Sequence, residues 1–146
     1  MLHGMKIELL KAEDIDQYKD LIDEVFGASN NVEKYKEYRE DKGYRIFVVK
    51  EGDLIVASAT QYSIELFTFD FQPSLMIFNV AVKESYRKQN IAKMLLEHII
   101  KNAKKDGYRS ISLTCLDTAY PAHKLYKSLG FEKANSLKFN LNLIPP

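Results

Sequence analysis

The sequence predicts a single mixed α/β domain, and its element order and composition carry that prediction. Stretches with helical spacing of apolar residues alternate with short β-branched and aromatic runs, in the expected order β-α-α-β-β-β-α-β-α-β-β. The chain is 46% hydrophobic and 28% charged, which is typical of a soluble globular protein and argues against disorder. No repeat, low-complexity stretch or linker divides it, so we expect one domain over residues 1–146.

The first half of the chain is expected to form a strand, two helices and a hairpin. Apolar side chains from Ile15 to Phe26 recur at three- and four-residue spacings, and Gly27 follows as a stop signal. The charged stretch Asn31–Asp41 has apolar or aromatic residues at every third position, which indicates a more exposed helix. A Glu-Gly-Asp turn separates two β-branched runs, which is a strong hairpin signal. The expected strands are Ile7–Leu10, Arg45–Lys50 and Leu54–Ile64.

The second half alternates strands with two amphipathic helices, after an irregular stretch at Glu65–Ser74. Leu75–Val82 is almost continuously apolar, as expected for a strand covered on both faces. Ile91–Lys105 has the clearest helical pattern, and its final lysines complement the helix dipole. Leu137–Leu143 alternates apolar and polar residues strictly, which predicts a last strand. The other expected elements are a strand at Ser110–Leu116, a helix at Ala119–Leu129 and a short strand at Phe131.

Charge and cysteine usage limit the partners and the compartment. Lys plus Arg total 21 and Asp plus Glu total 20, so we expect no nucleic-acid or membrane-surface partner. The single cysteine, Cys115, excludes an intrachain disulfide and fits a reducing compartment. The N-terminus lacks the apolar segment of a signal peptide, and no run approaches the ~20 apolar residues of a transmembrane helix. We therefore expect a cytoplasmic protein.

The polar, basic turn between the Leu75–Val82 strand and the following helix is the most informative functional feature. Free N–H groups at a helix start and the helix dipole favour an anion, and Arg87 and Lys88 add formal charge there. Such a turn can hold a pyrophosphate, whereas the alternative is a solvated turn with incidental lysines. The candidate N–H donors belong to Lys88, Gln89, Asn90, Ile91, Ala92 and Lys93.

Two separate segments resemble the GCN5-related N-acetyltransferase (GNAT) family. Val80–Val82 followed by Tyr86–Ala92 is similar to the acetyl-CoA motif of that family. About 40 residues downstream, His123–Phe131 (HKLYKSLGF) resembles its LY-x-x-x-GF signature, and the element order matches over essentially the whole chain. The sequence departs from the motif at Asn90, where the family has glycine. Asparagine is the non-glycine residue most tolerant of the left-handed region, so we expect the turn to form with positive φ at Asn90.

The resemblance implies a GNAT-like fold, in which helices flank a central, mostly antiparallel sheet. It implies acetyl-CoA as cosubstrate and transfer of the acetyl group to a primary amine by direct attack on the thioester. Neither a metal nor a covalent intermediate is required. The Leu75–Val82 strand would splay from the next strand, so that the backbone of Val80 and Val82 can hydrogen-bond the pantetheine arm. Residues 87–93 would hold the pyrophosphate.

The downstream segment supplies Tyr126 as the expected general acid. Departure of a thiolate is helped by a proton, and a phenol with a pKa of about 10 stays protonated at neutral pH. The family commonly uses the tyrosine of this motif in that way. Tyr126 also shares helical spacing with Leu125 and Leu129, so a packed aromatic is the alternative.

A general base is harder to identify, although an ammonium acceptor must lose a proton. The strand expected to face the cofactor offers Asn79 and no acid. Glu65, near the end of the preceding strand, is a speculative base, and a water chain using backbone carbonyls is equally compatible.

The remaining reactive side chains are assigned structural roles. Cys115 is expected to be a buried strand residue, and His98 to be packed on the apolar face of its helix. Three scattered histidines and one cysteine make no metal set with recognisable spacing.

The acceptor is expected to be a small-molecule or peptide amine. In the family its site is built near the tyrosine-rich segment Tyr35–Tyr44 and the aromatic residues Phe67, Phe69 and Phe71. Carboxylates at Glu37, Glu40 and Asp41 would suit a cationic amine there, and an exposed charged helix is the alternative.

Two other functions stay open. The fold could serve as a non-catalytic CoA-binding or protein-interaction module, or the enzyme could transfer a longer acyl group. A phosphate-loop nucleotidase is excluded because its motif is absent. The edge of the last strand, Leu137–Leu143, offers pairing in a possible homodimer.

Overall fold

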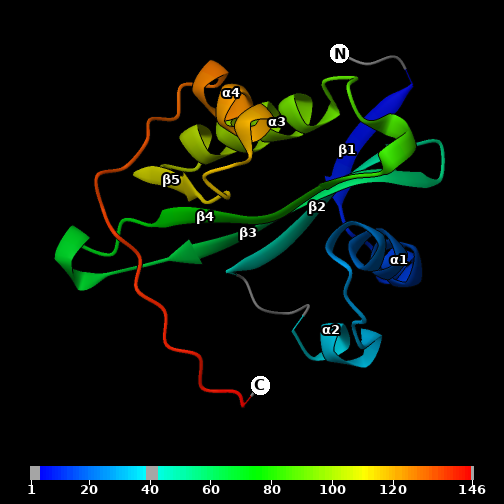
Figure 1. Cartoon of the computed structure of the whole chain (residues 1–146), viewed down its shortest axis with the longest axis horizontal. Helices are drawn as coiled ribbons and strands as arrows, with labels where there is room; N and C mark the ends of the chain where they lie inside the picture. The colour runs from blue at the N-terminus through cyan, green and yellow to red at the C-terminus, as the bar shows by residue number, and fades with distance from the viewer. Residues whose placement is uncertain (1–3, 39–42, 146) are drawn as a thin grey trace. The chain divides into compact units, whose positions relative to one another are not determined.

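The computed structural model describes residues 4–38 and 43–145, and its strands form one five-stranded sheet in the order β1-β2-β3-β4-β5 (Figure 1). Every neighbouring pair is antiparallel except β4 and β5, which are parallel. The predicted mixed, mostly antiparallel sheet is therefore confirmed. The strands are β1 Met5–Leu9, β2 Tyr44–Glu51, β3 Leu54–Ile64, β4 Ser74–Val82 and β5 Ser110–Leu113.

The chain divides into two compact units, Met1–Thr114 and Cys115–Pro146. The first unit holds the sheet and the helices α1 (Ile15–Phe26), α2 (Val32–Tyr38) and α3 (Ile91–Lys105). The second holds α4, Tyr120–Ser128. None of the described helices is long and apolar enough to cross a membrane. One domain over the whole chain stays a prediction.

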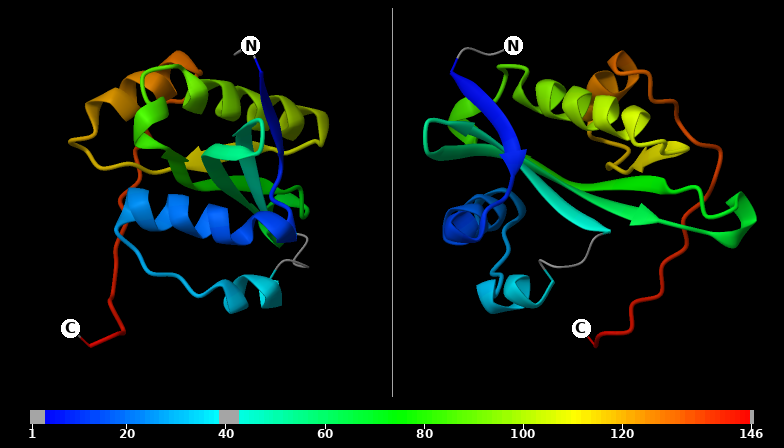
Figure 2. Two further views of the ribbon diagram at one scale, coloured as in Figure 1. Left: turned by 90° about the vertical axis from the view of Figure 1, so that its right-hand side faces the viewer. Right: turned by 180° about the vertical axis from the view of Figure 1, so that it is seen from behind.

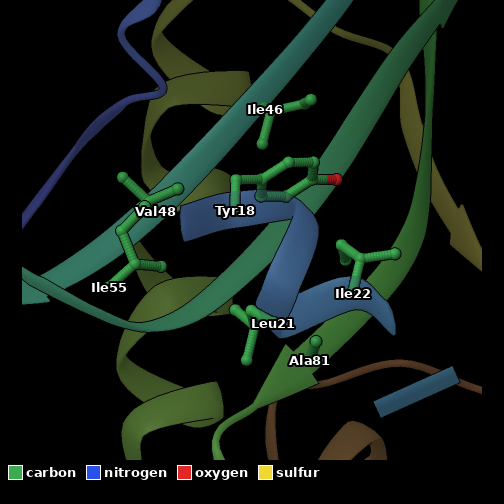
Figure 3. Close-up of a cluster of buried hydrophobic side chains, with 7 residues drawn as sticks. All are labelled: Tyr18, Leu21, Ile22, Ile46, Val48, Ile55 and Ala81. Atoms are coloured by element: carbon green, nitrogen blue, oxygen red, sulfur yellow. The ribbon is translucent and has the colours of Figure 1, made fainter. Parts of the chain in front are cut away.

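Helix α1 covers one face of the sheet and α3 the other (Figure 2). The periodic apolar residues of α1 form its buried stripe, and Gly27 ends the helix in the left-handed conformation, as predicted. The α1 stripe packs on side chains of β2, β3 and β4 (Figure 3). This core cluster consists of Tyr18, Leu21, Ile22, Ile46, Val48, Ile55 and Ala81.

Helix α3 buries most of its apolar stripe, with Ile91, Leu95 and Ile99 at the centre. His98 lies on the same helix with its ring edge-on to Phe47 of β2, and the ring centroids are 5.6 Å apart. Burial lowers the pKa of the His98 imidazole, which favours the neutral form. The predicted packed role of His98 is confirmed.

The expected strands at Phe131 and Leu137–Leu143 are wrong for this chain. No strand follows β5 in the described residues, and the Leu137, Phe139, Leu141 and Leu143 side chains are 84 to 88% exposed. Alternation shows which side chains share a face, but a strand also needs a neighbouring backbone to complete its ladder. Within its own unit, Cys115–Pro146, the described residues include no strand that could pair with it.

Two expectations about neighbouring strands are also corrected. β4 is not covered on both faces, because the Phe78 side chain is 44% exposed and Asn79 is exposed as well. β5 ends at Leu113, so Cys115 lies in an exposed connection and not in a buried strand.

A buried cation joins β1, β2 and the start of α1. Lys50 of β2 has a side chain only 6% exposed, with Nζ 2.9 Å from Glu8 Oε1 and 2.6 Å from Asp14 Oδ2. A nearly buried ammonium requires such partners, because an unpaired charge in the interior is costly. The Lys50 ammonium lowers the pKa of the Glu8 carboxyl and is itself stabilised in the charged form.

This pairing predicts that stability falls on acidification. The pKa of Glu8 is lower folded than its ordinary value of 4.5, so its contribution is present above that pH and lost as pH falls through the folded pKa. We expect the free energy of unfolding to fall between about pH 5 and pH 3, and to fall less steeply in Glu8→Gln. Urea denaturation across that range measures both slopes. Glu13→Gln, which removes an exposed carboxylate nearby, should keep the wild-type slope.

Candidate functional site

Strand β4 carries a bulge at Asn79. The register with β3 changes between the pairs Ser58–Ala81 and Thr60–Phe78, so Asn79 and Val80 together oppose the single residue Ala59. Asn79 has a left-handed backbone with φ of 51°. Asparagine is among the few residues that adopt this region at small cost, and a bulge bends the strand that carries it.

Beyond the bulge, β4 pairs with none of the described strands on its β5 side. The two strands pair only from Ser74–Ser110 to Ile77–Leu113, whereas β4 continues to Val82. Val80 and Val82 therefore lie beyond the last β4–β5 pair, and the splay of the two strands stays a prediction. Backbone groups on an unpaired edge can accept an extended ligand as an added strand.

The turn after β4 leads into the N-terminus of α3 through two left-handed residues, Lys88 with φ of 65° and Asn90 with φ of 60°. Positive φ at Asn90 was predicted and is confirmed. The first hydrogen bond within the helix runs from Met94 N–H to Asn90 O at 3.0 Å. The N–H groups of Ile91, Ala92 and Lys93 therefore have no acceptor inside the helix, and the Asn90 side chain makes no cap.

Cationic side chains accompany these free N–H groups. Arg87 and Lys88 are exposed in the turn. Arg87 Nε donates to the carbonyl oxygen of Val82 at 3.2 Å, which holds the guanidinium against the end of the unpaired β4 edge. The structure thus brings together the unpaired end of β4, two positive charges and the helix N-terminus. An anion bound there would be stabilised by the dipole of α3 and by the positive charges of Arg87 and Lys88.

A cavity of about 440 Å³ opens on the α1 side of the bulge. Its walls come from α1, α2 and strands β2 to β4, and Asn79 forms part of the lining. Four phenols from separate elements line it: Tyr18, Tyr35, Tyr44 and Tyr62. Burial raises the pKa of Tyr18 to about 12, so this phenol stays protonated at physiological pH. The cavity can hold a small, partly apolar molecule next to the bulge.

The residues expected to bind the acceptor are only partly brought together. Tyr35 and Tyr44 line the cavity, whereas Glu40, Asp41 and the side chain of Glu37 lie outside the described residues. The three phenylalanines are not part of its lining. Phe67 and Phe71 contact each other edge-on, and the Arg109 guanidinium lies 3.4 Å from the Phe69 ring centroid.

The candidate base Glu65 is distant from the bulge. It is exposed and directly follows β3, six positions beyond Ala59, which opposes the bulge. At about 3.3 Å per residue, six positions correspond to about 20 Å. The structure therefore does not bring Glu65 to Asn79, and its role as a base stays an untested expectation.

The candidate acid Tyr126 lies on α4 in the second unit. Its half-buried ring lies edge-on to Phe131 of the same motif, with centroids 6.1 Å apart. Burial raises the pKa of the Tyr126 phenol, and the Cys115 thiol acts in the same direction. The group is thus held in its proton-donating form, as a general acid requires.

The sequence reasoning missed the bulge and most of the cavity. It pointed to Tyr35 and Tyr44, but Tyr18 and Tyr62 come from α1 and β3, and only the folded sheet brings them to the same cavity. Asn79 did carry a signal, because it is a lone polar residue, tolerant of positive φ, within an otherwise apolar strand.

Residues 15–131 match the family described as the acetyltransferase (GNAT) family. The chain belongs to the GNAT family. The match extends from the first residue of α1 to the end of the Tyr126 motif, so it includes the unpaired end of β4, the turn and the cavity.

GNAT relatives of known name resemble this chain at moderate identity. The [ribosomal protein bS18]-alanine N-acetyltransferase of Escherichia coli K12 is 29% identical over 107 residues. That alignment covers 73% of this chain, which spans only 62% of the relative's length.

Solved GNAT-like structures share the fold. A transcriptional regulator from Bacillus halodurans C-125 superimposes with a TM-score of 0.84 at 22% identity, covering 95% of this chain and 99% of its own. An aminoglycoside acetyltransferase from an uncultured soil metagenomic sample reaches a TM-score of 0.80 at 21% identity, covering 95% and 97%.

The left-handed backbone predicts the effect of substitutions at Asn90. An alanine with φ near 60° is strained, so Asn90→Ala should lower the free energy of unfolding by ~1 kcal/mol. Asn90→Gly should stay within about 0.5 kcal/mol of wild type, because glycine adopts this region freely. Urea denaturation measures both, with Gln89→Ala in the same turn as control. An equal loss in the alanine and glycine variants would contradict the backbone explanation.

Proposed function

We propose that this chain is an acetyl-CoA-dependent N-acetyltransferase that acts on a primary amine in the cytoplasm. One observation carries the proposal: the unpaired edge of β4 ends where the free N–H groups of α3 and the Arg87 guanidinium begin. Coenzyme A has the matching order of groups, an extended amide-bearing arm followed by a pyrophosphate. Membership of the GNAT family supports the same ligand.

In this proposal the cosubstrate lies along β4 and ends at α3. The backbone of Val80 and Val82 bonds the pantetheine amides as an added strand would. The turn from Arg87 to Lys93 holds the pyrophosphate, with N–H groups of Ile91, Ala92 and Lys93 as the donors that lack a helical acceptor.

The reaction would take place at the bulge. Asn79 belongs both to the bend in β4 and to the cavity wall, so a thioester on the unpaired edge and an amine in the cavity would meet beside it. The amine nitrogen attacks the carbonyl carbon, and the tetrahedral intermediate collapses with loss of the CoA thiolate. Tyr126 gives its proton to the departing sulfur, and water accepts the proton lost by the amine.

The tyrosine-lined cavity is the proposed acceptor site. Its size and its mixture of apolar walls and phenols suit a small-molecule amine or the end of a peptide. The names of the relatives are compatible with both, since one is a ribosomal-protein-alanine and another an aminoglycoside acetyltransferase.

Turnover distinguishes an enzyme from a non-catalytic CoA-binding module. We expect thiol release from acetyl-CoA to rise above background when an amine panel containing peptides, amino sugars and simple alkylamines is supplied. Binding of CoA without any amine-dependent release would support the binding module. Preferential release from a longer acyl-CoA would instead indicate a different acyl donor.

The pyrophosphate assignment predicts a specific loss of CoA affinity in Arg87→Glu. Removing a charge-assisted hydrogen bond and introducing a like charge should weaken CoA binding by about tenfold or more. Isothermal titration of CoA measures the effect. Lys104→Glu changes charge equally at the opposite end of α3 and should leave the affinity near wild type. Unchanged affinity in Arg87→Glu would rule out the assignment.

The acid role predicts a defect in turnover and not in binding for Tyr126→Phe. We expect kcat to fall by about a hundredfold, as for loss of a general acid, with the Kd of acetyl-CoA nearly unchanged. Steady-state kinetics with the best amine of the panel measures this. Tyr120→Phe removes an exposed hydroxyl from the same helix and should retain activity. A loss well below about tenfold in Tyr126→Phe would argue against proton donation.

A further inference from the structure

The cavity beside the bulge has a charged part that the proposed reaction does not use. Helices α1 and α2 lie on the same side of the sheet and supply one wall of the cavity (Figure 2). That wall carries two cations, Lys19 of α1 and Lys34 of α2, and the connection between the helices adds Asn30 and Asn31. These four residues are called the polar end. The described lining residues from the strands are all uncharged.

The Asp23 carboxylate holds the polar end together. It pairs with the Lys19 ammonium and accepts hydrogen bonds from the Asn30 backbone N–H at 3.3 Å and from Asn30 Nδ2 at 2.9 Å. This pairing raises the pKa of Lys19, and Asp16 and Asp20 act in the same direction, yet none of the three carboxylates lines the cavity. An ammonium has three N–H donors and the Asp23 pair uses one. Lys19 can therefore still donate to a ligand.

Other lining residues add hydrogen-bond donors. Burial raises the pKa of Tyr18 to about 12, and Tyr44 and Tyr35 act in the same direction, so this phenol keeps its proton. Asn31 Oδ1 accepts the Glu33 backbone N–H at 2.8 Å, so the amide nitrogen of Asn31 is the group left for a ligand. Among the described residues the lining contains no carboxylate. A ligand that fits these donors brings acceptor oxygens, and an anionic acceptor gains the most.

We propose that the acceptor amine also carries a carboxylate or a phosphate, which binds the polar end while the amine lies at Asn79. This inference rests on the proposed function, because that function places the amine at the bulge. A second ammonium on the acceptor would instead be repelled by Lys19 and Lys34. The cavity volume of about 440 Å³ limits the acceptor to a small molecule. The substrate class is therefore a small amine with a negatively charged group.

Equilibrium binding to the CoA-bound protein tests this class without requiring turnover. The ligands are pairs that differ in one negative charge: γ-aminobutyrate against its amide for the carboxylate, and O-phosphoethanolamine against ethanolamine for the phosphate. We expect the anionic member of at least one pair to bind about tenfold or more tightly in isothermal titration, as for charge-assisted hydrogen bonds. No preference in either pair, or a preference for the neutral members, would overturn the inference.

Substitutions locate the preference within the cavity. Lys34→Glu reverses an exposed charge at the polar end and should abolish the preference. Lys101→Glu makes the same change on α3, which covers the other face of the sheet, and should keep it (Figure 2). Lys19→Gln should weaken the preference, and its unfolding midpoint is measured alongside because Asp23 loses a partner. A preference unchanged in both Lys34→Glu and Lys19→Gln would overturn the assignment to the polar end.

Thiol release with the same compounds separates this inference from the proposed function. We expect release from acetyl-CoA to be faster with the anionic member of the pair that binds selectively. Amine-dependent release without that preference would overturn the inference and leave the acetyltransferase proposal intact. Selective binding of the anionic members without any release would support the anion site and contradict the acetyltransferase proposal.

Discussion

The left-handed backbone at Asn79 is the constraint on which the proposed site depends. Had β4 continued regularly, a neighbouring strand could have followed it to Val82 and satisfied its backbone groups. The bulge sets two residues against Ala59 and bends the strand, and beyond it the edge of β4 has no described partner on the β5 side. Backbone N–H and C=O groups on an unpaired strand edge need other hydrogen-bond partners, because leaving them unsatisfied costs free energy. In the proposed function the cosubstrate supplies those partners, so the unpaired edge serves as its binding site.

The same residue links the two halves of the proposed reaction. Asn79 lies at the bend and in the wall of the tyrosine-lined cavity, so the positions proposed for the acyl donor and for the acceptor meet at this residue. The phosphate end follows from the chain path, because β4 leads through a short turn into α3 and Arg87 bonds back to Val82. Positive φ at Lys88 and Asn90 reverses the chain there without a glycine. Fixed backbone dipoles and one tethered guanidinium are thereby organised before any ligand arrives.

The sequence predicted those features of the fold that depend on residues close together in the chain. Spacing of apolar residues located α1 and α3, Gly27 marked a helix end, and the departure at Asn90 still pointed to a left-handed turn. Patterns failed where the outcome depends on distant partners. Leu137–Leu143 alternates as a strand does, yet no strand follows β5 in the described residues, because alternation alone does not supply the neighbouring backbone that a strand needs. The cavity could not be predicted either, since its tyrosines come from separate elements that only the sheet brings together.

Hydrogen exchange of backbone amides with and without CoA tests the central claim most directly, because it reads the backbone groups and not the side chains. The account predicts slowed exchange in two segments on adding CoA: the β4 edge from Phe78 to Val82 and the start of α3 from Ile91 to Lys93. The paired half of β4, Ser74–Ile77, should change little because its amides are already in a ladder. Binding of CoA that leaves both segments unprotected would contradict the account.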